Sequence, residues 1–152
     1  MTVDIRKATH DDLNGVLALY SQPELDDGRV LPERDAERIF ARFARYPDYT
    51  LYVAESGEGI VGTFALLIMD NLGHLGAPSA IVEDVAVAPD SQGRGIGQAM
   101  MRFAMRKAQE KNCYKIVLSS NAKRTRAHAF YETLGFERHG FSFRVQLDVV
   151  PA

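Results

Sequence analysis

Apolar and polar positions along this chain follow two different periods, and the changes between them divide the chain into successive elements. Apolar residues that recur every third or fourth position predict helices over residues 9–20, 33–46, 96–111 and 123–134. Alternating or continuous apolar runs predict strands over residues 3–7, 50–54, 60–68, 81–87, 114–119 and 136–147. The predicted order is therefore β-α-α-β-β-β-α-β-α-β.

The connections between these elements predict how the strands pair. Short loops join the second, third and fourth strands, which favours antiparallel neighbours, whereas a helix joins the fourth strand to the fifth and favours a parallel pair. We expect an α/β (α+β) fold with a mixed, mainly antiparallel sheet flanked by helices. Because the sequence contains no repeat, linker or low-complexity tract, it predicts one domain over residues 1–152.

Short sequence signals predict two of the helix ends. Thr9-His10-Asp11-Asp12 matches the capping box Ser/Thr-x-x-Asp/Glu, which predicts that the first helix begins there. Gly135 stands directly after the last predicted helix, in the position of a left-handed C-cap.

Composition and charge narrow the classes of function. The 152 residues carry a net charge of −2, which favours neither nucleic acid nor an anionic membrane as a partner. No apolar run approaches the roughly 20 residues that span a bilayer, and the first residues lack the apolar core of a secretory signal, so we expect a cytoplasmic protein. Cys113, the single cysteine, is interpreted as a packing residue, and the four scattered histidines predict no metal site.

A strand, a glycine-rich turn and a helix follow one another over residues 81–111. Alternating glycines at positions 93, 95 and 97 let the backbone approach a bulky anion, and the first N–H groups of the helix then point at that anion. The dinucleotide pattern G-x-G-x-x-G requires glycine where Gln98 or Met100 stands, and the triphosphate loop requires a Gly-Lys pair that the sequence lacks. The turn therefore predicts a site for another ligand that carries a pyrophosphate.

The hexad Gln92-Gly93-Arg94-Gly95-Ile96-Gly97 fits Q/R-x-x-G-x-G/A and resembles the pyrophosphate-binding motif of the GNAT superfamily of acyl-CoA-dependent N-acetyltransferases. The order of predicted elements is similar to the GNAT fold over essentially the entire chain. The resemblance implies acetyl-CoA as co-substrate and no metal, with backbone donors from Gln92, Gly93, Arg94, Gly95, Ile96, Gly97 and Gln98. It further implies that the pantetheine arm binds the backbone of Val85, Ala86 and Val87, and that Asn121 binds the coenzyme. The basic Arg126, like Lys123 and Arg124 beside it, is a candidate for a coenzyme phosphate by charge, with a solvated helix start as the alternative.

Two side chains are the candidates for proton transfer. The run Phe130-Tyr131-Glu132-Thr133-Leu134-Gly135-Phe136 resembles the family signature F-Y-E-x-x-G-F, which implies that the Tyr131 hydroxyl reprotonates the departing thiolate. In the family a carboxylate on the strand before the turn often serves as base, commonly through water. Regular alternation puts Glu83 on the face of Val85 and Val87 and Asp84 on the other, which favours Glu83, but a β-bulge would change the facing of Asp84. The structural alternatives are a core role for Tyr131, and an ammonium contact or surface ion pair for a carboxylate.

The resemblance implies acetyl transfer to a primary amine by direct attack in a ternary complex. Several stretches are similar to glucosamine 6-phosphate and aminoalkylphosphonate N-acetyltransferases, which favours a small amine as substrate. Loops 21–32 and 71–79 stand where the family builds its acceptor pocket, and the first is acidic. The alternatives are acetylation of a protein N-terminus or lysine, and a catalytically silent acyl-CoA-binding module. Exposed edge strands are compatible with a homodimer.

Overall fold

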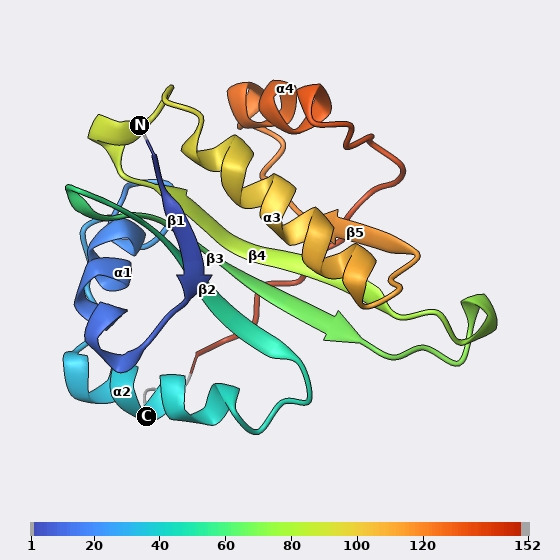
Figure 1. Cartoon of the computed structure of the whole chain (residues 1–152), viewed down its shortest axis with the longest axis horizontal. Coiled ribbons are helices and arrows are strands. Elements are labelled where there is room, and N and C mark those ends of the chain that lie inside the picture. Colours follow the sequence, from blue (N-terminus) through green and yellow to red (C-terminus); the bar gives the residue numbers. More distant parts are fainter. Residues whose placement is uncertain (1, 150–152) are drawn as a thin grey trace. The chain divides into compact units, whose positions relative to one another are not determined.

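The computed structural model describes residues 2–149, and its contacts divide the chain into two compact units, Met1–Leu118 and Ser119–Ala152. The first unit contains a five-stranded sheet in the order β1-β2-β3-β4-β5, labelled in Figure 1. Its strands are β1 (Asp4–Lys7), β2 (Tyr49–Ser56), β3 (Gly59–Met69), β4 (Ser79–Val87) and β5 (Lys115–Leu118). The first four pair antiparallel and β4 pairs parallel with β5, so the predicted mixed, mainly antiparallel sheet is confirmed.

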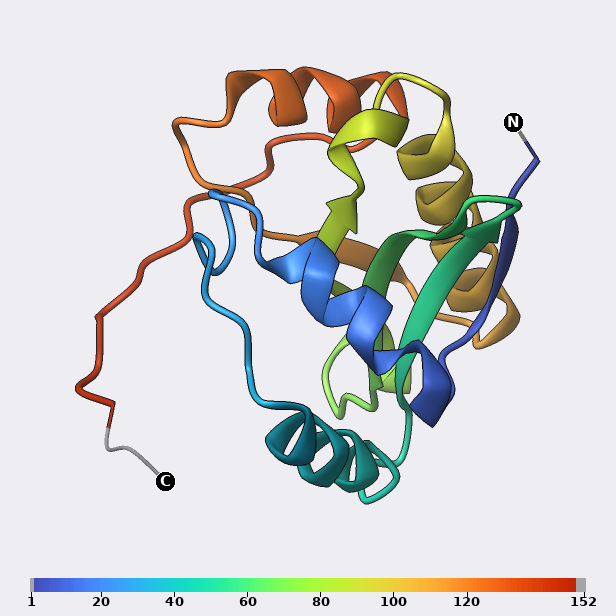
Figure 2. The ribbon, with the colours of Figure 1, turned by 90° about the vertical axis from the view of Figure 1, so that its left-hand side faces the viewer.

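Helices cover both faces of this sheet (Figure 2). One face carries α1 (Leu13–Tyr20) and α2 (Glu33–Phe43), and the other carries α3 (Ile96–Glu110). Successive strand residues point to opposite faces, so β2 buries Leu51 and Val53 under α1 and α2. Tyr52, between them, points to the α3 side, where its ring stacks on Phe64 and meets Phe103 of α3 edge-on. The buried stripe of α3 consists of Ile96, Met100, Met101, Ala104 and Ala108.

The start of α3 approaches the sheet closely at Gly62 of β3. A Cβ atom built there would lie 2.9 Å from Met100 Sδ and 3.2 Å from Ile96 Cγ2. Contacts below about 3 Å are too short for a real Cβ, so the absent side chain lets the first turns of α3 pack directly on β3. The absence of a side chain at Gly62 thus determines how closely the first turns of α3 pack on β3.

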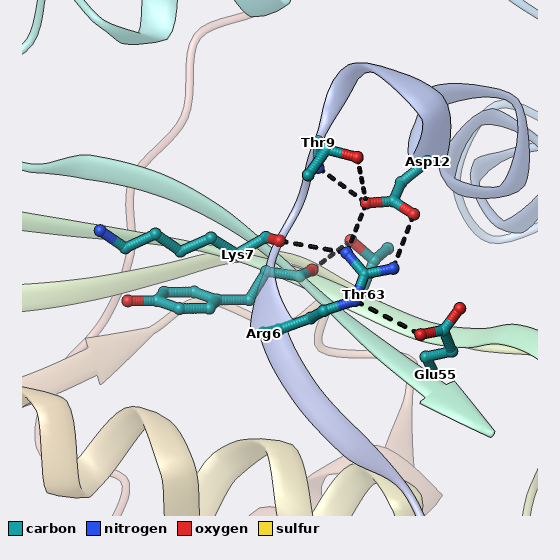
Figure 3. Close-up of polar contacts among 7 residues, drawn as sticks. Arg6, Lys7, Thr9, Asp12, Glu55 and Thr63 are labelled. Carbon is teal, nitrogen blue, oxygen red and sulfur yellow. Dashed lines mark hydrogen bonds and ion pairs between the residues drawn. The ribbon is translucent and has the colours of Figure 1, made fainter.

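The predicted capping box connects β1 to the first helix (Figure 3). The Asp12 carboxylate accepts a hydrogen bond from the Thr9 backbone N–H at 2.7 Å and pairs with both terminal nitrogens of Arg6 at 2.7 and 2.9 Å. Arg6 Nε also donates to Glu55 Oε1 of β2 at 3.4 Å. Residues 10–12 form a 3-10 turn, so α1 itself begins three residues later than a helix starting at His10 would. Arg6 of β1 therefore bonds both to β2 and to the turn that precedes α1.

The second unit contains α4 (Thr125–Thr133), within the range predicted from the sequence. Gly135 follows it with φ 95°, and the Phe136 N–H donates to the Tyr131 carbonyl at 3.1 Å, which confirms the predicted left-handed C-cap. Tyr131 is buried and its ring contacts Phe130 and Phe136 edge-on.

The strand predicted over residues 136–147 is not present: the described residues after α4 contain no strand. Its alternating apolar side chains are exposed, with Phe141 at 91% and Phe143 at 93%. Alternation specifies which side chains share a face, but a strand also needs a neighbouring strand for its backbone groups and a surface to cover that face. The pattern was therefore insufficient to place a strand here.

Candidate active site

An open strand edge begins where β5 stops pairing with β4. The parallel register ends at the pair Val82 and Leu118, whereas β4 continues to Val87 and keeps β3 on its other side. Ala88 donates to Val61 O at 2.8 Å, so Ala88 and Ala86 direct their backbone groups toward β3 and Val87 directs its own toward the open edge. This segment contains the positions 85–87 predicted to bind an extended ligand arm.

Carboxylates interrupt the alternation of β4 just before that edge. The register with β3 slips between Thr63 and Ala65, and Asp84 has a left-handed φ of 53°, so a β-bulge lies at Asp84. Glu83 pairs with Ala65, whose side chain belongs to the core under α1 and α2, so Glu83 lies on that side of the sheet. The charges of both Asp84 and Glu83 raise the pKa of the Tyr49 hydroxyl. Because of this bulge, regular alternation no longer distinguishes Asp84 from Glu83.

The local environment raises the pKa of both carboxyl groups. Partial burial raises the pKa of Glu83, and the charge of Asp84 adds to this effect. Partial burial also raises the pKa of Asp84, with a further contribution from Asp26 in loop 21–32. The pair is thus suited to take up and release protons nearer neutral pH than an isolated carboxylate.

Two tyrosines that the sequence analysis did not single out border this pair. Burial and then the charge of Asp84 raise the pKa of Tyr20, the last residue of α1, above its ordinary value. Burial raises the pKa of Tyr49 as well, followed by Asp84 and Glu83. Both hydroxyls therefore stay protonated and can donate hydrogen bonds. The only signal for them in the sequence was their place at the end of a helix and the start of a strand.

The glycine turn presents a row of backbone donors. Within residues 2–149, the N–H groups of residues 93–98 have no hydrogen-bond acceptor, and the first bond of α3 runs from Ala99 N to Gly95 O at 3.0 Å. Gly93 and Gly95 have φ values of 79° and 83°, and apart from the adjoining residues no atom of the described structure lies within 4 Å of a Cβ built on either. The Arg94 guanidinium lies 3.7 Å from a Glu58 carboxylate oxygen at the surface. Such a turn at the positive end of a helix offers donors of the kind that bind anions.

The second unit holds the remaining predicted residues. Asn121 Oδ1 accepts the Lys123 backbone N–H at 2.9 Å and its carbonyl lies 2.8 Å from His128 Nε2, so Asn121 organises the turn that leads into α4. Arg126 is exposed in the first turn of that helix. Burial raises the pKa of the Tyr131 hydroxyl, while the positive charge of Arg124 lowers it.

Comparison with known proteins assigns this arrangement to a family. A model of the acetyltransferase (GNAT) family matches residues 14–136. The chain belongs to the GNAT acetyltransferase family. A solved structure from Agrobacterium tumefaciens, provisionally named an acetyltransferase, superposes on this GNAT chain with a TM-score of 0.88 and 33% identity, over 95% of this chain and 99% of that one.

Two curated relatives of this GNAT protein act on small amines by name. The chain is 35% identical over 88 residues to a glucosamine 6-phosphate N-acetyltransferase of Trypanosoma brucei brucei, and the match spans 58% of each chain. It is 27% identical over 140 residues to an aminoalkylphosphonate N-acetyltransferase of Salmonella typhimurium, over 92% of this chain and 88% of that one.

The GNAT chain was also examined for metal-binding side chains and membrane-spanning helices. Among residues 2–149, no three His, Cys, Asp or Glu side chains are arranged to hold a metal ion. None of the helices described in the structure is long and apolar enough to span a membrane.

Cys113 follows the C-terminal end of α3, and burial raises the pKa of its thiol. The length of that 15-residue helix, roughly 20 Å, separates Cys113 from the glycine turn at the other end.

Proposed function

We propose that this protein transfers the acetyl group of acetyl-CoA to the primary amine of a small metabolite, by direct attack in a ternary complex. The observation that carries the proposal is the row of backbone N–H groups over residues 93–98 that lack an acceptor, directly after a strand whose edge is open. A pyrophosphate fits the row, and an extended arm fits the edge.

The residues at this site fit acetyl-CoA. The open space at Gly93 and Gly95 admits a phosphate to the amides of the turn, and Arg94 adds positive charge once it leaves Glu58. The backbone of Val85 and Val87 would hold the pantetheine arm, with Asn121 and Arg126 as further contacts. When bound, acetyl-CoA supplies a thioester whose acyl carbon accepts the amine nitrogen.

Protons must leave the amine and reach the thiolate. The substrate ammonium gives its proton to Glu83 or Asp84, directly or through water, and the raised pKa of both carboxyl groups brings their proton affinity closer to that of the amine. As the new C–N bond forms and the C–S bond breaks, the Tyr131 hydroxyl delivers a proton to the sulfur. The second nitrogen proton then leaves through water, and Tyr131 regains a proton from water. Its raised pKa keeps this hydroxyl protonated at neutral pH.

Direct attack is favoured over an acetylated cysteine. A nucleophilic thiol requires a lowered pKa, whereas burial raises the pKa of Cys113, and Asp48 adds to the effect. Its place beyond the far end of α3 also separates it from the donors that would hold the coenzyme. Neither condition for a covalent intermediate is met by this cysteine.

A small amine as acceptor is supported by the named substrates of the two relatives and by the carboxylates beside loop 21–32. The test is thiol release from acetyl-CoA with glucosamine 6-phosphate, aminoalkylphosphonates, unphosphorylated amino sugars, diamines and peptides. Turnover with a small amine supports the proposal. Turnover with peptides alone would favour a protein acetyltransferase, and coenzyme binding without any turnover would favour a silent binding module.

Cytoplasmic location and a homodimer stay predictions from the sequence.

The role of Tyr131 has its own test. Tyr131→Phe should lower kcat at least tenfold, because it removes the proton donor while keeping the ring contacts with Phe130 and Phe136. Tyr46→Phe is the matched control, since Tyr46 is 53% exposed and the variant keeps its edge-on ring contact with Tyr49. Thiol release at the wild-type rate over the full pH range in Tyr131→Phe would show that this hydroxyl is not the acid.

A further inference from the structure

Two glutamine side chains meet at one carbonyl of the open edge. Gln22 Nε2 donates to Val87 O at 3.1 Å, and Gln92 Nε2 donates to the same oxygen at 3.3 Å. A backbone carbonyl has two lone pairs, so these two amides fill its capacity to accept hydrogen bonds. Val87 O is also one of the groups that the pantetheine arm would use.

The two glutamines belong to different parts of the fold. Gln92 lies in the glycine turn itself, five residues after Val87. Gln22 comes from loop 21–32 and is separated from Val87 by 65 positions in the sequence. Its bond is therefore a tertiary link between the proposed acceptor loop and the proposed coenzyme strand.

Loop 21–32 is closed by its own backbone bonds, and Gln22 is central to them. The N–H groups of Leu25 and Asp27 both donate to the Gln22 carbonyl, at 3.0 and 3.1 Å, and the Asp26 N–H donates to Tyr20 O at 2.9 Å. These bonds hold the loop that carries Asp26, whose charge raises the pKa of Asp84 and Tyr20. The backbone of Gln22 thus orders this acidic loop, while its side chain fixes the loop to β4.

We infer that Gln22 is a positioning residue that couples coenzyme binding to the acceptor loop, an inference that rests on the proposed function. An amide N–H of the coenzyme arm can bond to Val87 O only when one glutamine leaves. Gln92 is anchored in the turn that binds the pyrophosphate, so Gln22 is the side chain displaced. Coenzyme binding then releases the loop from β4, and the amine enters a site whose acidic loop is free to adjust.

The experiment compares Gln22→Met with the matched variant Gln92→Met. Each replaces a carboxamide with an apolar side chain of similar length, and each removes one donor to the same carbonyl. CoA binding is measured by calorimetry, and backbone hydrogen exchange is followed over residues 21–29 with and without CoA. Wild-type loop amides should exchange faster when CoA is bound. Gln22→Met should bind CoA about two- to tenfold more tightly, the effect of one neutral hydrogen bond, with fast loop exchange that CoA does not change.

Gln92→Met frees one lone pair of Val87 O without touching the loop, so CoA no longer has to displace Gln22 and the loop amides should keep slow exchange when CoA is bound. The inference is overturned if Gln22→Met binds CoA with unchanged or lower affinity, or if CoA leaves unchanged or slows loop exchange in the wild-type protein. The same results separate the two proposals. Absence of CoA binding in the wild-type protein contradicts the proposed function, whereas normal CoA binding without any effect of Gln22 contradicts only the coupling.

Discussion

Replacement of Asp12 with asparagine tests how strongly the Arg6 cluster stabilises the first unit. The Asp12 side chain is 8% exposed and accepts hydrogen bonds from Arg6 and from the Thr9 backbone. These contacts, chiefly the hydrogen bond from Arg6, lower the pKa of Asp12 from 3.8 to about 2. That difference corresponds to about 2.5 kcal/mol in favour of the ionised carboxylate. Because the Arg6 side chain is 31% exposed, solvent screening reduces the expected loss in Asp12→Asn to about 1–2 kcal/mol.

The loss should depend on pH in a defined direction. A carboxyl group with a lower pKa in the folded state stabilises the fold fully above its unfolded pKa and loses that effect as the pH falls through its folded pKa. The stability difference between wild type and Asp12→Asn should therefore be constant from pH 7 to about 5 and shrink below about pH 4. Urea unfolding followed by far-UV circular dichroism at pH 7, 5 and 3.5 measures it, and at pH 7 the Tm should fall by about 2–8 °C.

Asp11→Asn is the matched control, because the Asp11 side chain lies in the same 3-10 turn and is 99% exposed. It should change the free energy of unfolding by less than about 0.5 kcal/mol. If Asp11→Asn destabilises as much as Asp12→Asn, or if the Asp12 effect is the same at pH 3.5 as at pH 7, the cluster does not stabilise the fold through the ionised carboxylate.

Three further changes test the site and its support. Gly62→Ala should lower the free energy of unfolding by about 1–3 kcal/mol and weaken CoA binding, because the new Cβ meets Met100 and displaces the first turns of α3. Gly95→Ala should cost about 1 kcal/mol and raise the Kd for CoA, because φ 83° is unfavourable for alanine and its methyl group enters the space for the phosphate. Glu83→Gln or Asp84→Asn, whichever removes the base, should shift the pH profile of acetyl transfer to higher pH, since the unprotonated amine must then form without it.

Each of these changes has a control on a comparable residue. Gly57→Ala and Gly73→Ala place a methyl group in open space at negative φ, so neither should affect stability or CoA affinity beyond a few tenths of a kcal/mol. Glu110→Gln alters a surface ion pair with Lys107 and should leave the pH profile unchanged. If a control glycine variant lowers stability or CoA affinity as much as its test variant, the structural role of Gly62 or Gly95 is contradicted. If the pH profile of acetyl transfer is unchanged in both Glu83→Gln and Asp84→Asn, neither carboxylate is the base.

The sequence was sufficient for those parts of the fold that local spacing determines. The apolar stripe of α3 predicted its buried face, and loop lengths predicted that β4 runs antiparallel to β3 and parallel to β5. The C-cap at Gly135 followed from one residue type in one position. In each case the decisive interaction lies within a few residues of the signal.

The parts that escaped prediction depend on partners distant in the sequence. The bulge at Asp84 arises from its register against β3, and the contact of Gln22 with Val87 bridges 65 positions. The grouping of Tyr20 and Tyr49 around the carboxylates likewise requires α1, β2 and β4 to pack together. The spacing of residue types along the chain carries no information about contacts between distant segments. For the same reason the alternation after residue 136 predicted a strand for which the described residues provide no neighbour.

The exposed alternation of the C-terminal segment has a consequence for handling the protein. Phe141, Phe143, Val145 and Leu147 are all more than 70% exposed, and the residues between them are Ser142, Arg144 and Gln146. Extended segments with this pattern can stack on copies of themselves, and a charged residue in the middle opposes stacking. We therefore expect Arg144 to oppose stacking of this segment. Replacement of Arg144 by an uncharged residue of similar length, such as glutamine, would lower the concentration at which purified protein precipitates.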